Sequence, residues 1–269
     1  MGIANLSMSY RPITSTPFPR SGNYCEIPPC VALKPYIRCF WEKEPPHIPS
    51  ETAGRLVIPD TCMDIIVWVD HSSHRVSTVF CAMDEQPYWT QEEDARSAFG
   101  IRFFGWSAML FGTESFRHTK NRVFCPDEFF RGITTELTGI VCRFHTLQER
   151  ALAAEKILLC RLNDNRLNCD LMNVISDMIA YRGRRRVSEI ARQNALSERK
   201  MERIFAENVG VSPKTLSNLI RYQLVWQEIA CGRADVADLV EKYGYTDQAH
   251  LLHDFRFRHG MTPAQALKI

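Results

Sequence analysis

The sequence lacks three features that would narrow its class at once: paired cysteine motifs, a long hydrophobic run and a large net charge. Its ten cysteines form no Cys-x-x-Cys pair, so neither a zinc ribbon nor a dithiol redox motif is indicated. No apolar run is long enough to span a membrane, and the N-terminus has no leader-like apolar segment. We therefore expect a cytoplasmic protein with free thiols and no membrane partner.

The charge is unevenly distributed, although the net value is only +2. Residues 1–170 carry 18 Lys and Arg against 20 Asp and Glu, a net of −2. Residues 171–269 carry 15 against 11, a net of +4. The C-terminal third is therefore the part that suits a phosphate-bearing partner.

Two kinds of periodicity divide the chain. Residues 1–30 are rich in Pro, Ser and Thr and are expected to form an irregular arm. Short β-type runs then alternate with turn residues up to about residue 130. These runs are Leu56–Ile58, Met63–Val69, Arg75–Cys81 and Phe99–Phe104. Their spacing predicts an antiparallel sandwich or barrel.

Helical spacing begins near residue 134. Apolar residues recur there every three or four positions, at Leu137, Ile140, Val141 and Phe144. This face could pair two subunits, which we favour, or could pack on the chain's own β domain. Residues 163–165 interrupt this helical spacing, and we place the domain boundary there. The first domain, 1–162, is expected to be β-rich with helices at about 134–162, and the second, 163–269, is expected to be helical. The fold class is α+β with two domains.

The last third of the chain repeats itself. Before an internal turn the matched apolar positions are 49 residues apart: Val187, Ile190 and Ala191 correspond to Val236, Leu239 and Val240. After the turn they are 50 apart: Met201 and Phe205 correspond to Leu251 and Phe255. Each copy ends alike, in Gly210-Val211-Ser212-Pro213 and in Gly260-Met261-Thr262-Pro263. This pattern predicts two helix-turn-helix units, an arrangement typical of DNA-binding proteins.

The first unit spans about 187–208 and the second about 235–258. Ser197 is the expected N-cap of the first recognition helix, whereas Thr246 or Asp247 would begin the second. Ser212 and Pro213 begin a long helix, to about residue 230, that joins the units. A helix of that length would hold two recognition helices about one DNA turn apart, facing successive major grooves.

The region from Val187 to Ala266 resembles the DNA-binding domain of the AraC/XylS family of bacterial transcription regulators. The residues that carry the resemblance are Ile190-Ala191, Ser197, Met201, Arg203, Phe205, Gly210, Ser212-Pro213 and Arg221, then Gly244-Tyr245, Asp247-Gln248, His250, Phe255, Gly260 and Thr262-Pro263. Ala195 stands where the family usually has Gly. The resemblance implies double-stranded DNA and RNA polymerase as partners, and we expect an activator with no catalytic role and no cofactor.

The resemblance also implies which residues contact DNA. They are Ser197, Glu198, Arg199, Glu202 and Arg203 in the first unit, and Thr246, Gln248, Ala249, Leu252 and His253 in the second. Arg can bond guanine and Gln can bond adenine, but Leu and His are unusual choices, so we expect the first unit to supply more of the specificity. The run Arg184-Arg185-Arg186 is a candidate for phosphate contacts, with a solvated turn as the alternative.

The N-terminal domain has a weaker resemblance of its own. Residues 33–41, 58–60 and 100–103 are similar to an N-terminal domain found on some AraC-type regulators, which implies a cupin-like fold used for sensing or association. Aromatic side chains could line a pocket for a small-molecule effector or could be plain core: Trp41, Trp68, Phe103 and Trp106.

Two other functions remain open for this domain. A cupin-type metal enzyme or metal sensor would need clustered His and carboxylate ligands, and no convincing set is present: His71-x-x-His74 has a suitable spacing but no third ligand nearby. We therefore expect no metal site. A ligand-free dimerisation module is the other alternative, and the possible homodimer is compatible with either.

Overall fold

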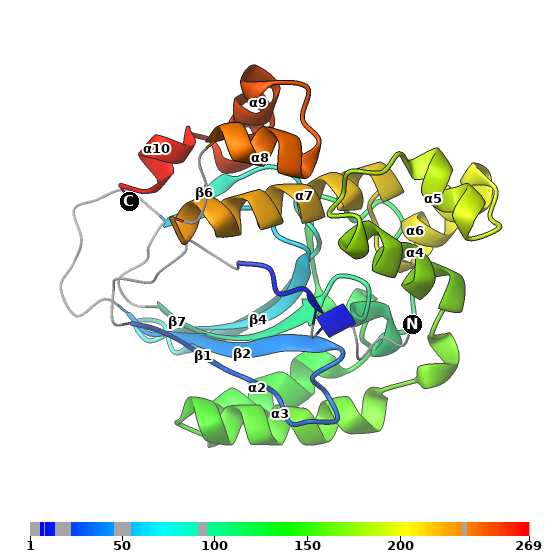
Figure 1. Ribbon diagram of the computed structural model, residues 1–269. Helices are drawn as coiled ribbons and strands as arrows, with labels where there is room; N and C mark the ends of the chain where they lie inside the picture. Colours follow the sequence, from blue (N-terminus) through cyan, green and yellow to red (C-terminus); the bar gives the residue numbers. More distant parts are fainter. Residues whose placement is uncertain are drawn as a thin grey trace.

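The computed structural model describes residues 6–7, 9–13, 23–45, 55–90, 96–232 and 236–268, and it has a β-rich N-terminal part and a helical C-terminal part (Figure 1). The main sheet is antiparallel and contains, in spatial order, β1 (Tyr24–Ile27), β2 (Ile37–Lys43), β7 (Arg96–Phe104), β4 (Cys62–Asp70), β5 (Arg75–Cys81) and β8 (Val123–Phe124). A separate two-stranded sheet pairs β3 (Arg55–Val57) with β6 (Tyr88–Thr90). The expected two-domain α+β architecture is confirmed.

The four strands expected from the sequence are present as β3, β4, β5 and β7. Strand β1 lies inside the stretch that we expected to be an irregular arm, and that expectation is wrong there. Its four residues have no clear alternation of their own, and they are held by pairing with β2, where Tyr24 lies opposite Lys43. The rest of the arm is only partly inside the described residues, and Asp235, at the expected start of the second unit, lies outside them.

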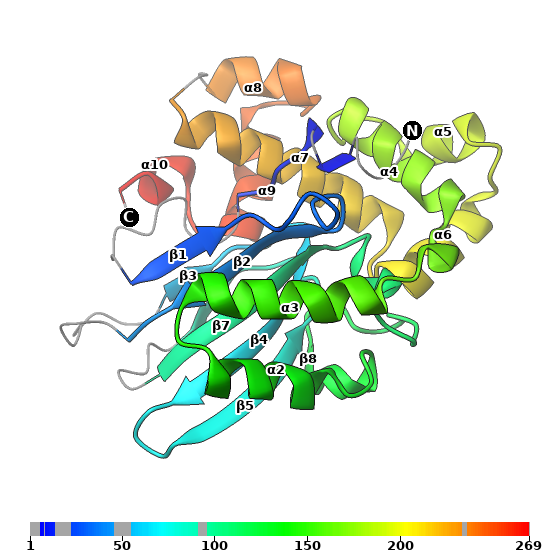
Figure 2. The same ribbon diagram turned by 90° about the horizontal axis from the view of Figure 1, so that it is seen from below.

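The two faces of the main sheet differ in character. Phe99, Ile101 and Phe103 of β7 are fully buried, as are the apolar residues opposite them on β4. This face is covered by α2 (Ile133–Arg143) and α3 (Leu147–Arg161), which lie side by side across the sheet (Figure 2). Because side chains alternate along a strand, Gly100 and Arg102 face the other way.

Helix α2 packs on the sheet of its own chain. Leu137, Ile140 and Val141 are at most 6% exposed and belong to the main core, with Phe144 packed against them. Our preference for this face as a subunit contact is therefore corrected: its side chains already cover apolar strand residues and are not available to a second copy.

The C-terminal part is built from helices. They are α4 (Cys169–Ala180), α5 (Val187–Gln193), α6 (Glu198–Asn208), α7 (Pro213–Ala230), α8 (Val236–Tyr243), α9 (Gln248–His259) and α10 (Pro263–Ala266). Short 3₁₀ segments lie at Ala108–Leu110, Pro126–Glu128 and Asp164–Arg166, the last of them at the predicted linker. The predicted caps form: Ser197 accepts from the Lys200 N–H and Ser212 from the Thr215 N–H.

The apolar cores do not follow the division into two domains. The main core joins the sheet, α2, α3 and the first helix-turn-helix unit, up to Ile220 of α7. A second core joins the rest of α7 with α8 and α9, and it includes Leu56 and Ile58 from the N-terminal part. Helix α7 therefore belongs to both cores, and the second helix-turn-helix unit packs directly against the segment around β3.

Candidate functional site

The outer face of α6 is the first candidate DNA-contacting surface. Met201, Ile204 and Phe205 are buried on the inner side, at the spacing of one helical face. Ser197, Glu198, Arg199, Glu202 and Arg203 are all exposed. Neither Arg199 nor Arg203 makes a hydrogen bond or ion pair with the described residues, so both guanidinium groups are available for a base or phosphate.

A shallow hollow runs along this face. It is lined by Arg117, Ser197, Arg199, Lys200, Glu202, Arg203 and Ala206. Arg117 comes from the N-terminal part, where its Nη2 lies 2.8 Å from Glu207 Oε1, at the C-terminal end of α6. Nothing in the sequence marked Arg117, because it is brought to α6 by the fold and not by a motif.

The outer face of α9 is the second candidate surface. Asp247, and not Thr246, caps this helix by accepting from the His250 N–H. The predicted contact residues are all exposed: Thr246, Gln248, Ala249, Leu252 and His253. Compared with α6, this surface offers fewer charged groups, in keeping with the expected weaker base reading.

Helix α9 is fixed to α7 through Asp254. Its carboxylate accepts from Tyr245 Oη at 2.8 Å and pairs with Arg258 at 3.2 Å and with Arg221 at 3.7 Å. Arg221 also stacks over the Tyr245 ring, 4.3 Å from its centroid. Arg221 and Tyr245 were marked by the family resemblance and Asp254 was not, although it connects the other three.

The arginine run before α5 is exposed, as a phosphate-contacting segment must be. Arg185 stacks on Tyr181 at 3.8 Å and bonds Gln193, so its side chain is held on its own unit. Arg184 packs against Gly244, in the turn of the second unit. Arg186 has no partner among the described residues.

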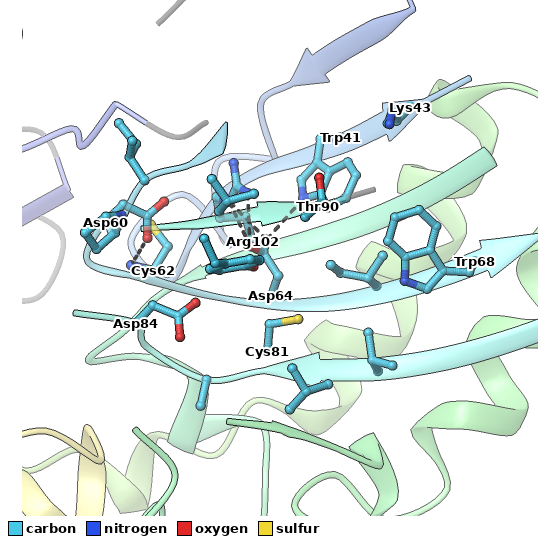
Figure 3. A pocket seen from close by; sticks show the side chains of 18 of the residues that line it. Trp41, Lys43, Asp60, Cys62, Asp64, Trp68, Cys81, Asp84, Thr90 and Arg102 are labelled. Carbon is cyan, nitrogen blue, oxygen red and sulfur yellow. Dashed lines mark hydrogen bonds and ion pairs between the residues drawn. The ribbon is translucent and has the colours of Figure 1, made fainter. Parts of the chain in front are cut away.

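A cavity of about 320 Å³ lies on the other face of the main sheet, beneath β3 and β6 (Figure 3). Trp41 and Trp68, two of the four aromatic residues considered for a pocket, line it. Phe103 and Trp106 do not: both are fully buried, Phe103 on the opposite face of β7 and Trp106 stacked on Phe104. The alternation along β7 explains why Arg102, and not Phe103, reaches the cavity.

Trp41 and Arg102 are held in a network on the cavity floor. Arg102 Nε and Nη2 each lie 3.0 Å from a carboxylate oxygen of Asp64, a forked arrangement. Trp41 Nε1 donates to the same Asp64 at 3.1 Å, and the Arg102 guanidinium lies 5.6 Å from the Trp41 ring. A Cβ at Gly100 would lie 2.0 Å from the indole, so only Gly lets Trp41 lie across the sheet.

Two further carboxylates face this cavity. Burial raises the pKa of Asp60 to about 6, a rise that the Arg102 charge opposes. Burial raises the pKa of Asp84 to about 7, and the charges of Asp60 and Asp64 raise it further. The sequence did not indicate this cluster, because Asp60 and Asp84 are brought together by the fold.

Among the residues that the structure describes, no group of three or more His, Cys, Asp or Glu side chains is placed to hold a metal ion. His71 instead shares a hydrogen bond of 2.9 Å with Ser97 Oγ. All ten cysteines are unpaired. Within the described residues, no helix is both long and apolar enough to cross a bilayer.

The cavity wall is also a contact with the C-terminal helical part. Gln223 of α7 is fully buried, and its Nε2 donates to the Pro59 carbonyl at 2.9 Å while its Oε1 accepts from the Ile13 N–H at 2.8 Å. Pro59 lines the cavity, as does Ile58, which also packs in the second core. One short segment therefore contacts the cavity on one side and α7 on the other.

Comparison with known proteins agrees with the C-terminal geometry. Residues 190–269 match a family of helix-turn-helix domains, and residues 25–124 match a domain family of unknown function. No curated protein matches the chain.

The matches to solved structures are remote. ToxT from Vibrio cholerae is 12% identical with a TM-score of 0.44, and the match covers 81% of this chain and 95% of ToxT. A ToxT structure with bound unsaturated fatty acid is 13% identical with a TM-score of 0.40, covering 80% and 89%. An AraC-type regulator from Chromobacterium violaceum is 20% identical with a TM-score of 0.34, covering 37% and 89%.

The helix-turn-helix match covers the two units that α7 joins, and both units present a solvent-exposed recognition helix. With a separate sheet domain before them, these features describe a two-domain protein whose C-terminal part matches the helix-turn-helix domain family and supports a DNA-binding transcription regulator.

Proposed function

We propose that this regulator is a sequence-specific activator that places α6 and α9 in successive major grooves and acts with RNA polymerase in the cytoplasm. The main support for the proposal is the exposed polar surface of α6. Arg199 and Arg203 are exposed, unpaired and on one helical face, which is what bidentate reading of guanine requires. The proposed role includes no catalytic step.

The spacing of the two units supports binding to both grooves. Helix α7 has 18 residues, a length of about 27 Å at 1.5 Å per residue. Its two ends carry the first and second units, and a turn of DNA is about 34 Å. The second core and the Asp254 pairs fix α9 on α7, so the separation of the recognition helices is set by the fold.

The test is selection of bound duplexes from a random DNA pool. We expect a recovered sequence with two half-sites about one helical turn apart, the stronger contributed by α6. Arg203→Ala should then lose about 1–3 kcal/mol of discrimination at one base pair. Arg131→Ala, which removes an exposed Arg from the N-terminal part, is the matched control. Equal binding of Arg203→Ala and the parent to selected and scrambled duplexes would contradict the proposal.

We further propose that the N-terminal domain responds to a small-molecule effector bound in the cavity. The support is the shared segment at Ile58 and Pro59, which lines the cavity and also contacts α7. A molecule that shifts this segment must also shift the support of the second unit. A bound ligand should therefore change DNA affinity in the parent, and this change should be smaller in Gln223→Leu.

A homodimer, if it forms through the helical face of the N-terminal domain, uses α3. Leu152 and Leu159 are 57% and 44% exposed, and they lie seven residues apart, on one side of that helix. The residues first considered on α2 are buried. Sedimentation of the parent and of Leu152→Glu tests whether α3 forms the contact. Loss of a dimer in the variant supports α3, and an unchanged dimer rejects it.

A further inference from the structure

The chemistry of the cavity indicates which class of effector it takes, an inference that rests on the sensory role proposed above. The cavity has one face of aromatic side chains and a set of charged groups at its edge. The lining residues used below are Trp41, Trp68, Asp60, Asp84, Arg102 and Lys43. Its volume of about 320 Å³ is at the lower end of the range for small-molecule pockets.

The obvious anchor for an anionic ligand is already occupied. Arg102 is only 8% exposed, and its Nε and Nη2 are both bonded to Asp64. Its Nη1 lies 3.5 Å from Tyr24 Oη and 3.8 Å from Glu26 Oε1. Each nitrogen of the guanidinium therefore already lies near an acceptor, and its positive charge is paired with Asp64 and lies close to Glu26.

The other cation at the cavity is distant from the carboxylate cluster. Lys43 lies opposite Ala98 on β7, whereas Cys62, two residues after Asp60, lies opposite Phe104. Ala98 and Phe104 are six residues apart on β7, so Lys43 and Cys62 are separated by about 20 Å along the strand direction. Lys43 also has an interaction of its own. It therefore cannot neutralise Asp60 or Asp84.

Neither of those two carboxylates forms an ion pair with the described residues, although the charges of Arg102 and Arg38 act on Asp60 from a distance. Asp60 accepts a single hydrogen bond, from the Cys62 N–H at 2.7 Å, and Asp84 makes no hydrogen bond or ion pair with the described residues. Figure 3 shows both carboxylates on the same side of the cavity, with Arg102 and Asp64 between them and Trp68. Burying such groups without a partner costs free energy that a positively charged ligand would recover.

The raised pKa of each group has the same origin. Burial raises the pKa of Asp60 to about 6 and that of Asp84 to about 7, and neighbouring carboxylates raise both. Arg102 opposes the rise at Asp60. The cavity lining is therefore short of positive charge, although it contains an arginine.

We propose that this cavity binds an organic cation, whose ammonium group lies against Asp60 and Asp84 and whose apolar body packs on Trp41. The Trp41 indole offers an apolar surface to that body. The same lining disfavours carboxylates, because a ligand anion would lie among three Asp side chains and the nearby Arg102 is already paired with Asp64.

Two matched sets of probes test the charge preference. The first is 2-phenylethylamine, 2-phenylethanol and phenylacetate, and the second is hexylamine, hexanol and hexanoate. We expect calorimetric titration of the full chain to give at least tenfold tighter binding for the amine than for the alcohol in at least one set, with the carboxylate weakest. A carboxylate that binds as well as its amine overturns the proposal, as does an amine no tighter than its alcohol in both sets, or no binding by any probe.

Variants assign the preference to the two carboxylates. Asp84→Asn and Asp60→Asn should each weaken amine binding at least tenfold and leave alcohol binding within about twofold. Glu44→Gln, which removes an exposed carboxylate just after β2, is the control and should change neither. Since both Asp side chains are half-buried without an ion-pair partner, the Asn variants should unfold at or above the parent's temperature. Equal loss for amine and alcohol, or no loss for either, overturns the assignment.

DNA binding measured on the same preparation separates this inference from the proposed function. If the parent binds its selected duplex but shows no preference for amines, the proposed class of effector is wrong and the proposed function as a DNA-binding regulator is retained. If duplex selection recovers no sequence while amine binding depends on Asp60 and Asp84, the proposed ligand class is supported and the proposed function is rejected.

Discussion

Ala195 occupies a backbone conformation that suits glycine. Its φ is 53°, in the left-handed region, at the turn between α5 and α6. The equivalent position of the second unit is Gly244, with φ of 67°. For a residue with a Cβ, this conformation costs about 1–2 kcal/mol. The family resemblance marked this position, and the φ value gives the physical reason.

Ala195→Gly should therefore raise the free energy of unfolding by about 0.5–1 kcal/mol, because relief of strain exceeds the added entropy of the unfolded chain. Denaturant titration measures the change. Ala206→Gly, within α6, is the matched control and should lower stability by about 1 kcal/mol. If both substitutions destabilise the protein equally, the turn at Ala195 is not strained.

Gly100 is required for a different reason, since a Cβ there would overlap the Trp41 indole. Gly100→Ala should displace the ring from Asp64 and cost about 1–3 kcal/mol, as overpacking does. It should also change tryptophan fluorescence, because an indole leaves the cavity floor. Gly139→Ala is the control: nothing lies within 4 Å of its Cβ, and a helical Ala in α2 should be neutral or stabilising. Unchanged stability and fluorescence in Gly100→Ala would contradict this arrangement.

At the scale of elements, helices were easier to predict than strands. The three- and four-residue spacing in the last third predicted α5 to α9 closely, because each helix buries one face of its own sequence. Strands β1, β6 and β8 contain two to four residues and have no period to detect. They exist because a neighbouring strand pairs with them. Sequence also could not tell whether the apolar face of α2 covers the sheet or a second subunit.

The position of α9 depends on a histidine that stays neutral. His259 is 2% exposed, shares a 2.8 Å hydrogen bond with Tyr222 Oη, and stacks on Phe255. Burial lowers its pKa to about 4, below the value of about 6.5 in an unfolded chain. The unfolded state therefore binds the proton more readily, so stability from this group is complete above pH 6.5 and declines as the pH falls towards 4.

The expected loss is about 3 kcal/mol between pH 6.5 and 4, since each pKa unit corresponds to 1.36 kcal/mol. Asp60 and Asp84 change stability in the opposite direction over part of this range, because their pKa values are raised. The measurement is therefore the difference between the parent and His259→Gln in free energy of unfolding at each pH. A difference that is constant from pH 7 to pH 4.5 would show that His259 does not titrate below its usual pKa.

At the scale of the whole molecule, contacts between distant parts of the chain determine the functional surfaces. Gln223 meets Pro59 across 164 residues of sequence, and Arg117 meets Glu207 across 90. Neither pair has a local signature, so no reading of motifs could have found them. The same is true of Asp60 and Asp84: each is visible in the sequence, but their common cavity depends on how two sheets pack.

Arg117 provides the test of this arrangement. The N-terminal part places its side chain in the hollow that runs along α6, together with Arg199 and Arg203. If the two parts stay packed when DNA is bound, Arg117 lies beside the backbone of the same duplex and adds one phosphate contact. Arg117→Ala should then weaken binding to all sequences similarly and reduce the salt-dependence slope of log affinity by about 1.

Its effect on stability should be small, because the Arg117–Glu207 pair is 45% and 43% exposed, and exposed pairs contribute about 0–1 kcal/mol. Lys156→Ala, on the exposed side of α3, is the control for the loss of one positive charge and should leave the slope unchanged. If Arg117→Ala also leaves the slope unchanged while Arg203→Ala loses discrimination, the N-terminal part separates from α6 on DNA. The contact at Glu207 would then belong to the free protein alone, and DNA binding would have to break it.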